Sequence, residues 1–376
     1  MPLRLELYSA DHVERARRFN DRLKNGDIES AFFLPERAPS DSTNDTLRPA
    51  PDAALVKRQF IVLDDREVRG GFLLQEQFCY LAGETRWCTN IQMPISEGIV
   101  DRRFSHVAPR MIDLLLRDRP LVFAVGMGTL DAPFAKFLAA MKWRVMLVPF
   151  RFYVLQPTRF LKHVRALRDT RWRSTVADFA ALTGLGSAAI RTAQRFRKHS
   201  SVRCLSANRI DTWDEQISSL WTIYRAGSSF CAARDRASLP FFLNLTDSGL
   251  LAYLLTDQQG ILRGWAVLKV KAMQNNKHFG SLRVATLLDA VSELNFERAV
   301  LQAMIDCAKE NTADILVMNQ LCDRWLVASE QSGFWRGPSN YVFASSPALT
   351  QTIAKVDLKF SRVHCSRADG DGRVNL

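Results

Sequence analysis

The spacing of apolar residues divides the first half of the chain into alternating helical and extended segments. Apolar side chains recur at helical spacing from Val13 to Leu23, which predicts an amphipathic helix over about residues 10–24. Strands are predicted at 58–63, 67–81, 87–93 and 121–125, a strand-like segment at 145–155, and helices at 104–116 and 132–141. This mixture of elements predicts a domain of the α+β class.

The second half repeats the order. Helical spacing runs over 213–224, 296–309 and 324–331, and extended segments are predicted at 250–255, 261–270, 282–288, 315–318 and 341–344. The first two of these strands flank Asp257-Gln258-Gln259-Gly260, which favours a hairpin. Two halves with one order of elements suggest a duplicated domain.

Short matches at a constant offset support the duplication. Val68-Arg69-Gly70 corresponds to Leu262-Arg263-Gly264, and Met111-Ile112-Asp113 to Met304-Ile305-Asp306, with offsets of about 194 and 193 positions. The apolar run at 121–125 corresponds in the same way to 315–318. This period is far longer than that of a solenoid repeat, so it indicates two copies of a whole domain.

The expected organisation is therefore two domains with a connector. We place an N-terminal domain at 1–155, a basic helical connector at 156–201, a C-terminal domain at 202–346 and a tail at 347–376. With 376 residues, the chain is long enough for each domain to bury its own core.

Composition predicts a cytoplasmic protein. Hydrophobic residues make up 47% and charged residues 24% of the chain, which is typical of a globular protein, and the longest apolar runs are too short to span a bilayer. The charged N-terminus does not resemble a signal peptide. The seven cysteines contain no CxxC pair and the histidines no metal-binding spacing, so neither disulfides nor a metal are expected.

The net charge of +12 predicts an anionic partner. Nucleic acid such as tRNA, an acidic acyl carrier protein, a phosphorylated cofactor and an anionic membrane surface all fit this charge. The densest basic stretches are 159–173 and 191–203, inside or next to the expected connector. A solvated basic face of the connector is the favoured explanation of these stretches.

Three segments carry a resemblance to a known family. Residues 92–98 run from a strand into a turn, 315–319 followed by 330–334 form a strand, an Asn and a helix ending in Gly-Phe, and 138–143 repeats that ending. Together they resemble the GNAT acyltransferase superfamily. Two copies are also similar to FemAB-like peptidyltransferases and N-myristoyltransferases. The resemblance implies two GNAT-like domains, each a mostly antiparallel, twisted mixed sheet flanked by helices.

The resemblance also implies a donor site for acetyl-CoA or another acyl-CoA. A helix N-terminus with free N–H groups accepts a pyrophosphate, and a Gly lets the anion approach the backbone. In the first half the candidate residues are Met93, Ile95, Ser96, Gly98, Ile99, Val100, Arg102, Arg103, Gly126 and Gly128. The second half has Asp289 and Glu293 at the corresponding place, where carboxylates would repel phosphate, so donor binding is expected in the first half.

Acyl transfer to an amine or hydroxyl needs a base and an acid. By the resemblance, Glu76 on a central strand is the candidate base and Tyr153 the candidate acid, although the family's usual Tyr before Gly-Phe is absent from both halves. Two other functions remain open. One is aminoacyl transfer from tRNA, as in FemAB-like proteins, and the other is a non-catalytic binding protein with degenerate GNAT domains.

Overall fold

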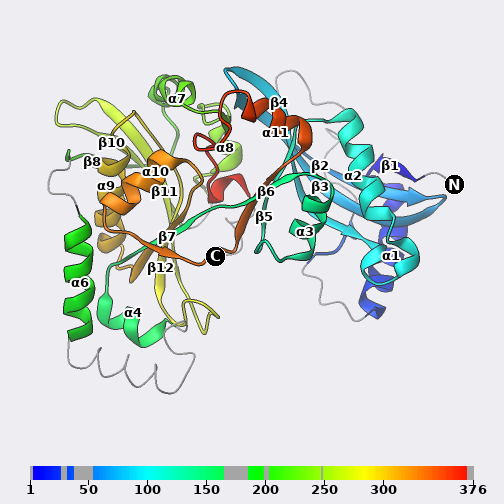
Figure 1. The fold of residues 1–376 in the computed structure, drawn as a ribbon, viewed down its shortest axis with the longest axis horizontal. Coiled ribbons are helices and arrows are strands. Elements are labelled where there is room, and N and C mark those ends of the chain that lie inside the picture. The colour runs from blue at the N-terminus through cyan, green and yellow to red at the C-terminus, as the bar shows by residue number, and fades with distance from the viewer. Residues whose placement is uncertain are drawn as a thin grey trace. The chain divides into compact units, whose positions relative to one another are not determined.

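The computed structural model describes residues 3–26, 32–37, 54–164, 185–198, 203–246 and 249–370 (Figure 1). It forms two compact units, each with its own mixed sheet. Unit 1 comprises 1–79, 84–146 and 342–355, and unit 2 comprises 80–83, 147–341 and 356–376. Much of the expected connector and the last six residues of the expected tail lie outside the described residues.

The sheet of unit 1 carries helices on both faces. In spatial order its strands are β1 (Arg4–Leu7), β2 (Leu55–Asp64), β3 (Glu67–Leu81), β4 (Glu84–Ser96), β5 (Val122–Met127), β15 (Tyr341–Ser345) and β6 (Arg144–Leu147). Its helices are α1 (Val13–Asn25), α2 (Val107–Asp118), α3 (Pro133–Ala140) and α11 (Pro347–Ala354). Successive residues of a strand point to opposite faces. Phe60 and Val62 therefore pack with α2, whereas Ile61 and Leu63 pack with α1.

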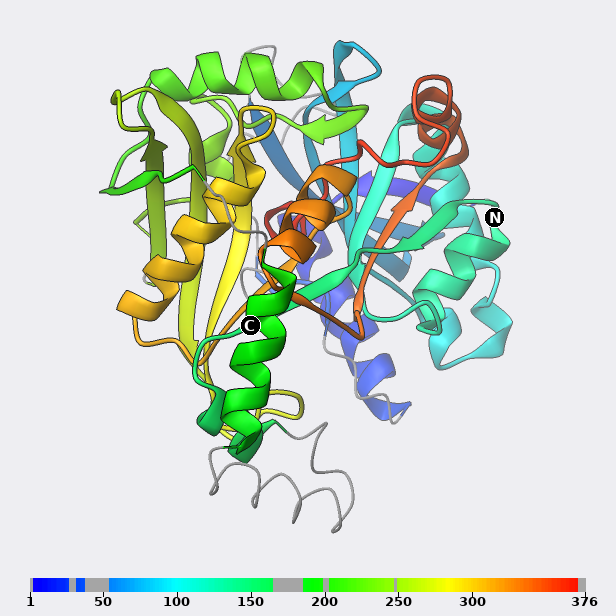
Figure 2. The ribbon, with the colours of Figure 1, turned by 60° about the vertical axis from the view of Figure 1, so that its left-hand side comes forward.

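Unit 2 is built in the same way. In spatial order its strands are β8 (Ser206–Ile210), β10 (Leu250–Thr256), β11 (Leu262–Ala272), β12 (Arg283–Ser292), β13 (Ile315–Asn319), β7 (Phe150–Val154) and β14 (Trp335–Gly337). The other elements are α4 (Pro157–His163), α6 (Leu185–Arg197), α7 (Gln216–Ala226), β9 (Phe230–Ala232), α8 (Leu239–Phe242), α9 (Glu297–Glu310), α10 (Asp323–Gln331) and the 3-10 turn η6 (Arg367–Asp369). Helix α9, drawn in gold, lies over the central strands of the unit (Figure 2).

The expected α+β class with two mixed, helix-flanked sheets is confirmed. β3 and β11 occupy the same position in their sheets, as do β4 and β12, and β5 and β13. The repeated glycine has the same function in both. A Cβ on Gly70 would lie 2.7 Å from the Ile95 carbonyl oxygen, and one on Gly264 would lie 2.9 Å from the Val291 carbonyl oxygen. Both glycines therefore allow the next strand to approach the backbone closely.

In the strand order given above, each sheet contains one strand from the other half of the chain. The expected strand-like segment 145–155 forms two strands, of which β6 joins the sheet of unit 1 and β7 lies between β13 and β14 in unit 2. The last strand of the second half, β15, lies between β5 and β6 in unit 1. Hydrophobic periodicity identifies a strand but not its partner, so pairing in the folded chain decided this exchange.

The exchange makes a prediction about fragments. β15 contributes the fully buried Val342, Phe343 and Ala344, and Phe343 stacks on Phe123 with ring centroids 6.3 Å apart. Burial of one large apolar side chain contributes roughly 1.5–3 kcal/mol. A fragment of residues 1–147 should therefore show no cooperative urea transition by circular dichroism. The same fragment with residues 340–356 attached through a Gly-Ser linker should show one. Equal transitions in both fragments would contradict the role given to β15.

Candidate functional site

The central parallel strands of unit 2 separate along their length. β12 and β13 pair from Val284–Ile315 to Leu287–Met318, and the pairing ends there although β12 continues to Ser292. Beyond that point β12 shifts its register against β11, which leaves Leu288 as an extra residue. A bulge of this kind bends a strand. The backbone groups at the ends of β12 and β13 therefore need hydrogen-bond partners from other segments.

The C-terminal segment supplies some of these partners. Ser366 forms a bridge with Gln320, directly after β13, and the His364 amide donates to the Phe230 carbonyl at 2.8 Å. The Gln320 side-chain oxygen also accepts from the Cys365 amide at 3.2 Å. Residues from about 363 to 369 thus connect β9 with the end of β13 and bring their side chains to the end of β12.

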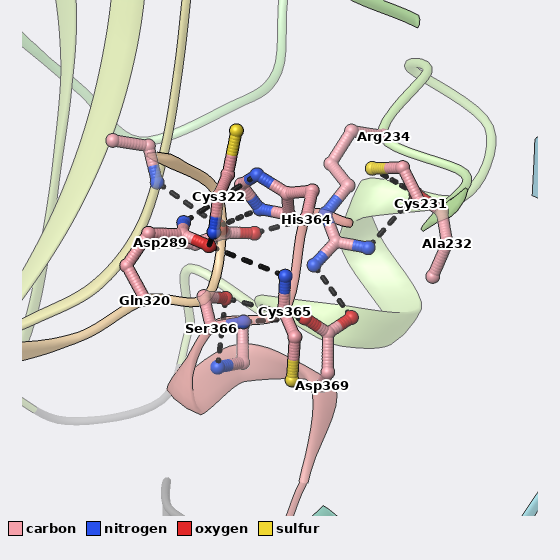
Figure 3. A network of polar contacts seen from close by, with 12 residues as sticks. Cys231, Ala232, Arg234, Asp289, Gln320, Cys322, His364, Cys365, Ser366 and Asp369 are labelled. Atoms are coloured by element: carbon pink, nitrogen blue, oxygen red, sulfur yellow. Dashed lines mark hydrogen bonds and ion pairs between the residues drawn. The ribbon is translucent and has the colours of Figure 1, made fainter. Parts of the chain in front are cut away.

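A buried charge cluster forms where these segments meet (Figure 3). Arg234 Nε donates to Asp289 Oδ2 at 3.0 Å, and Arg234 Nη2 donates to Asp369 Oδ1 at 2.6 Å. The third nitrogen, Nη1, donates to the Ala232 carbonyl at 2.8 Å. The side chains of Arg234 and Asp289 are each only 1% exposed. One guanidinium therefore holds two carboxylates from distant parts of the chain.

His364 extends the cluster to Tyr224. Its Nε2 lies 2.9 Å from Asp289 Oδ1, and its Nδ1 lies 2.6 Å from the Tyr224 hydroxyl. With Nε2 protonated, the ring donates to the carboxylate and accepts from the phenol. Trp325 Nε1 also donates to the Tyr224 oxygen at 3.0 Å. The result is a carboxylate, an imidazole and a phenol in sequence, a set of groups able to hold or relay a proton.

Charge pairing decides the ionisation of Asp289. Burial alone would raise the pKa of this carboxyl, but Arg234 and His364 outweigh burial and lower the pKa to about 2. Burial raises the pKa of Tyr224 well above its ordinary value of 10.0. Asp289 is therefore an anion and Tyr224 a neutral phenol throughout the physiological range.

Arg324 connects the cluster with a cavity. Its guanidinium carbon lies 4.7 Å from the centre of the Tyr224 ring, and its Nη1 lies 3.6 Å from Glu297 Oε1. Its Nε and Nη2 are buried and have no oxygen acceptor among the described residues. Burial raises the pKa of Glu297, and Arg324 opposes that shift. The first residues of α9 and α10 are thus joined by a charge pair, and the Cys322 thiol also interacts with the Arg324 guanidinium.

The cavity itself has a volume of about 810 Å³ and opens at the N-terminal ends of α9 and α10. Its lining includes Asn295 and Arg298 at the start of α9, Asp323 and Arg324 at the start of α10, and Arg203. Asn295 has a left-handed φ of 70°, which turns the chain from β12 into the helix. The first N–H groups of a helix lack partners within it, so this end favours an anion.

The structure changes the expectation for the two acidic residues that follow the bulge. Asp289 is neutralised within the buried cluster, and Glu293 pairs with Arg263 at 2.6 Å. Arg263 also holds Asp257 at 2.8 Å. The repulsion of phosphate expected from Asp289 and Glu293 is therefore largely removed, because both carboxylates have guanidinium partners.

The corresponding turn of unit 1 contains its own anion. β4 leads into two short 3-10 helices, η3 (Glu97–Ile99) and η4 (Arg102–Phe104), before α2. Glu97 is buried there, and its carboxylate accepts from Arg22 and Arg69 at 2.9 Å each. A Cβ on Gly98 would lie 2.7 Å from the Phe104 carbonyl oxygen, so this glycine allows the turn to pack on itself.

The other expected donor residues are distributed along the same stretch. Met93, Ile95 and Ser96 lie on β4, Ile99 in η3, Val100 just after it, and Arg102 and Arg103 in η4. Arg103 pairs with Asp101 at 2.7 Å and is exposed. At the end of β5, Gly126, Met127 and Gly128 all have positive φ, from 54° to 104°. Their expected part in donor binding stays a prediction.

The two expected catalytic residues lie in different sheets. Glu76 is buried on β3 of unit 1, where its oxygens accept from Arg58 and Arg119 at 2.8 Å each. Both oxygens are thus engaged, which argues for a structural carboxylate. Tyr153 lies on β7 of unit 2 and packs against Phe334, with ring centroids 5.5 Å apart. Burial raises the pKa of Tyr153, which disfavours its ionisation. Their catalytic roles stay predictions.

The cluster around Asp289 was not found from the sequence. Its five central residues are Tyr224, Arg234, Asp289, His364 and Asp369. They come from four separate segments, since His364 and Asp369 share the C-terminal one, and they show no common spacing. The one available signal was Asp289 itself, a charged residue inside an otherwise apolar strand pattern at 284–291. Such a residue must be paired when the strand is buried.

The comparisons with known proteins address the fold. No protein-family model matches the sequence, and no curated protein sequence matches it significantly. A solved protein from Enterococcus faecalis V583, a probable N-acyltransferase, is similar with a TM-score of 0.52 and 11% identity, over 93% of this chain and 74% of that chain. Saccharomyces cerevisiae N-myristoyltransferase with bound myristoyl-CoA gives a TM-score of 0.46 and 10% identity, over 77% and 69%.

The first of these likenesses concerns the fold alone, and it supports the α+β architecture of two mixed, helix-flanked sheets that the sequence suggested. Both sheets are mixed, flanked by helices and contain a parallel pair of strands in the middle, β4 with β5 and β12 with β13. None of the described helices is long and apolar enough to cross a membrane. No group of three potential metal ligands comes together among the described residues.

The buried cluster predicts a large effect of removing its only guanidinium. Arg234→Ala leaves Asp289 and Asp369 without their shared cation in the core, which should lower the free energy of unfolding by about 3–5 kcal/mol. Arg86→Ala removes an exposed pair with Glu84 and should cost at most about 1 kcal/mol. Urea denaturation at neutral pH measures both. Equal losses in the two variants would show that the cluster is not needed for stability.

The lowered pKa of Asp289 predicts an acid-sensitive contribution to stability. The folded-state pKa of about 2 lies below the ordinary value of 3.8, so the ionised carboxylate stabilises the fold. This contribution of roughly 2 kcal/mol is complete above about pH 5 and is lost as the pH falls through about 2. Urea midpoints of wild type and Asp289→Asn should converge over this range. A constant difference between them would contradict the assignment.

Proposed function

We propose that the protein is an acyltransferase that binds its acyl-CoA donor in unit 2. The observation that carries this proposal is the separation of β12 from β13 beside a cavity lined by two helix N-termini and three arginines. Phosphate oxygens of CoA would accept from the N–H groups of α9 and from Arg298 and Arg324. The pantetheine arm would then run toward the point where the strands diverge, as the resemblance implies.

The proposal moves the donor from the first half to the second. In unit 1 the carboxylate of Glu97 already accepts from Arg22 and Arg69, so a phosphate would have to displace an internal ion pair. In unit 2 Arg324 lines the cavity and faces one carboxylate, Glu297, at 3.6 Å, a longer ion pair than those of Glu97. A CoA phosphate would compete with one guanidinium partner there, whereas in unit 1 it would compete with two.

The buried cluster would hold the side chain of Arg324 in position at the cavity. Arg324 stacks over Tyr224, and Tyr224 is fixed by His364 and Trp325. The position of the cavity arginine thus depends on a phenol that cannot move without breaking buried hydrogen bonds. The acyl acceptor is an amine or a hydroxyl, which attacks the thioester carbon and releases CoA as the thiol.

Matched variants in the two units test the location of the donor. Arg324→Lys keeps the charge but loses the planar donor set, and should weaken CoA binding about tenfold in calorimetry. Arg102→Ala and Arg103→Ala, at exposed positions in unit 1, should leave CoA affinity unchanged. If the unit 1 variants lose binding and Arg324→Lys does not, the donor lies in unit 1. Absence of CoA binding by the wild type would rule out a CoA donor.

A substitution at Glu297 should strengthen CoA binding, in contrast to Arg324→Lys. Its buried carboxylate lies 3.6 Å from Arg324 and competes with a phosphate for the same guanidinium. Glu297→Gln removes that negative charge with little change in shape, so CoA should bind several-fold more tightly. Glu310→Gln, at the far end of the same helix, is the control and should change nothing. Weaker binding by Glu297→Gln would contradict the proposed position of the phosphates.

A non-catalytic binding protein is the second candidate function. The observation that favours it is that both turns carry a buried carboxylate, Glu97 in unit 1 and Glu297 in unit 2. These residues would then be permanent internal substitutes for a phosphate. Transfer assays with acyl-CoA and with aminoacyl-tRNA as donors separate the enzymes from this alternative, because a degenerate protein would release neither CoA nor tRNA.

A further inference from the structure

Helix α6 has an apolar face that is exposed in the described part of the chain. The residues directed into unit 2 are Ser187, Ile190 and Gln194, and Ser187 shares a hydrogen bond of 2.9 Å with Thr158 of α4. At 100° per residue, the opposite side of the helix carries Leu185, Ala188, Ala189, Thr192 and Phe196. All five are exposed. Phe196 is 88% exposed and Leu185 69% exposed. Among the exposed large apolar residues, only Leu358, at 74%, lies between these two values.

Cations border this face, and the helix itself contains no acid. Arg191, Arg195, Arg197 and Lys198 are all exposed, and none pairs with a described carboxylate. Neither α6 nor its neighbour α4 contains an acidic residue. In Figure 1 the two helices lie side by side at the margin of their unit. A ring and a leucine thus project from a helix whose charges are all of one sign.

We propose that the outer face of α6 binds an anionic lipid surface. The helix would lie in the plane of the membrane, with Leu185 and Phe196 entering the boundary between headgroups and acyl chains. Arg191, Arg195 and Lys198 would meet the lipid phosphates. A basic helix with exposed Phe or Leu on one face has the chemistry of an interfacial helix.

Two other occupants fit this face less well. A second copy of the chain would place arginines against arginines, which is repulsive. A nucleic acid would use the cations and a base could stack on Phe196, but Leu185, Ala188 and Ala189 would stay in water. A lipid surface uses both the charges and the apolar side chains, and its flatness suits a convex, protruding helix.

Vesicle sedimentation of the full chain tests the proposal. The protein should bind mixed phosphatidylcholine and phosphatidylglycerol vesicles at low salt, bind pure phosphatidylcholine vesicles much more weakly, and dissociate at high salt. Phe196→Ser and the double variant Arg191→Glu with Arg195→Glu should each weaken partitioning about tenfold or more. All these positions are exposed, so the variants should unfold at the wild-type urea midpoint.

Two control variants separate this face from general charge and apolarity. Phe241→Ser removes another exposed ring, 53% exposed on α8, and Arg209→Glu reverses another exposed cation, on β8. Both should bind vesicles like the wild type. The proposal fails if the wild type ignores anionic vesicles at low salt. It also fails if the controls lose as much binding as the α6 variants, or if single-stranded nucleic acid binds while vesicles do not.

Discussion

The divergence of β12 from β13 sets the requirements that the rest of unit 2 meets. Two parallel strands that part at Leu287 and Met318 leave polar groups in a place where water cannot satisfy them. The C-terminal segment of the chain supplies one set of partners through its hydrogen bond to the Gln320 side chain. Arg234 supplies another by neutralising the charge of Asp289. Without these partners, the separation of the strands would leave a buried charge and unpaired backbone groups in the core.

The same divergence connects stability with the proposed chemistry. The helices that follow the two strands, α9 and α10, begin at the diverging ends, so their free N–H groups gather around one cavity. Arg324 stands between that cavity and the Asp289, His364 and Tyr224 chain. A rigid, fully bonded layer behind a binding site holds its side chains in place, which lowers the entropic cost of binding.

The two sheets share one architecture but differ in the turn that follows the fourth strand of each. Both have the same strand order and the same close glycine contact, at Gly70 and Gly264. Their turns differ in how the buried acid is held. Glu97 pairs with two arginines in unit 1 at 2.9 Å each, whereas Glu297 in unit 2 pairs with one, Arg324, at 3.6 Å. The exchange of β7 and β15 means that neither sheet is made from one contiguous half of the chain.

The sequence alone determined most of the central elements and their repeated order. Local periodicity located β3 at 67–81 and the helix of residues 10–24, because apolar spacing reflects which face of an element is buried. Apolar periodicity did not identify the charge cluster around Asp289. Asp289 was interpreted as a repulsive charge, but Arg234 and His364, distant in the chain, make it part of a neutralised core. Periodicity reports burial, whereas the partner of a buried charge or of a strand is chosen only when distant segments meet, so tertiary structure decided the strand exchange and the charge cluster.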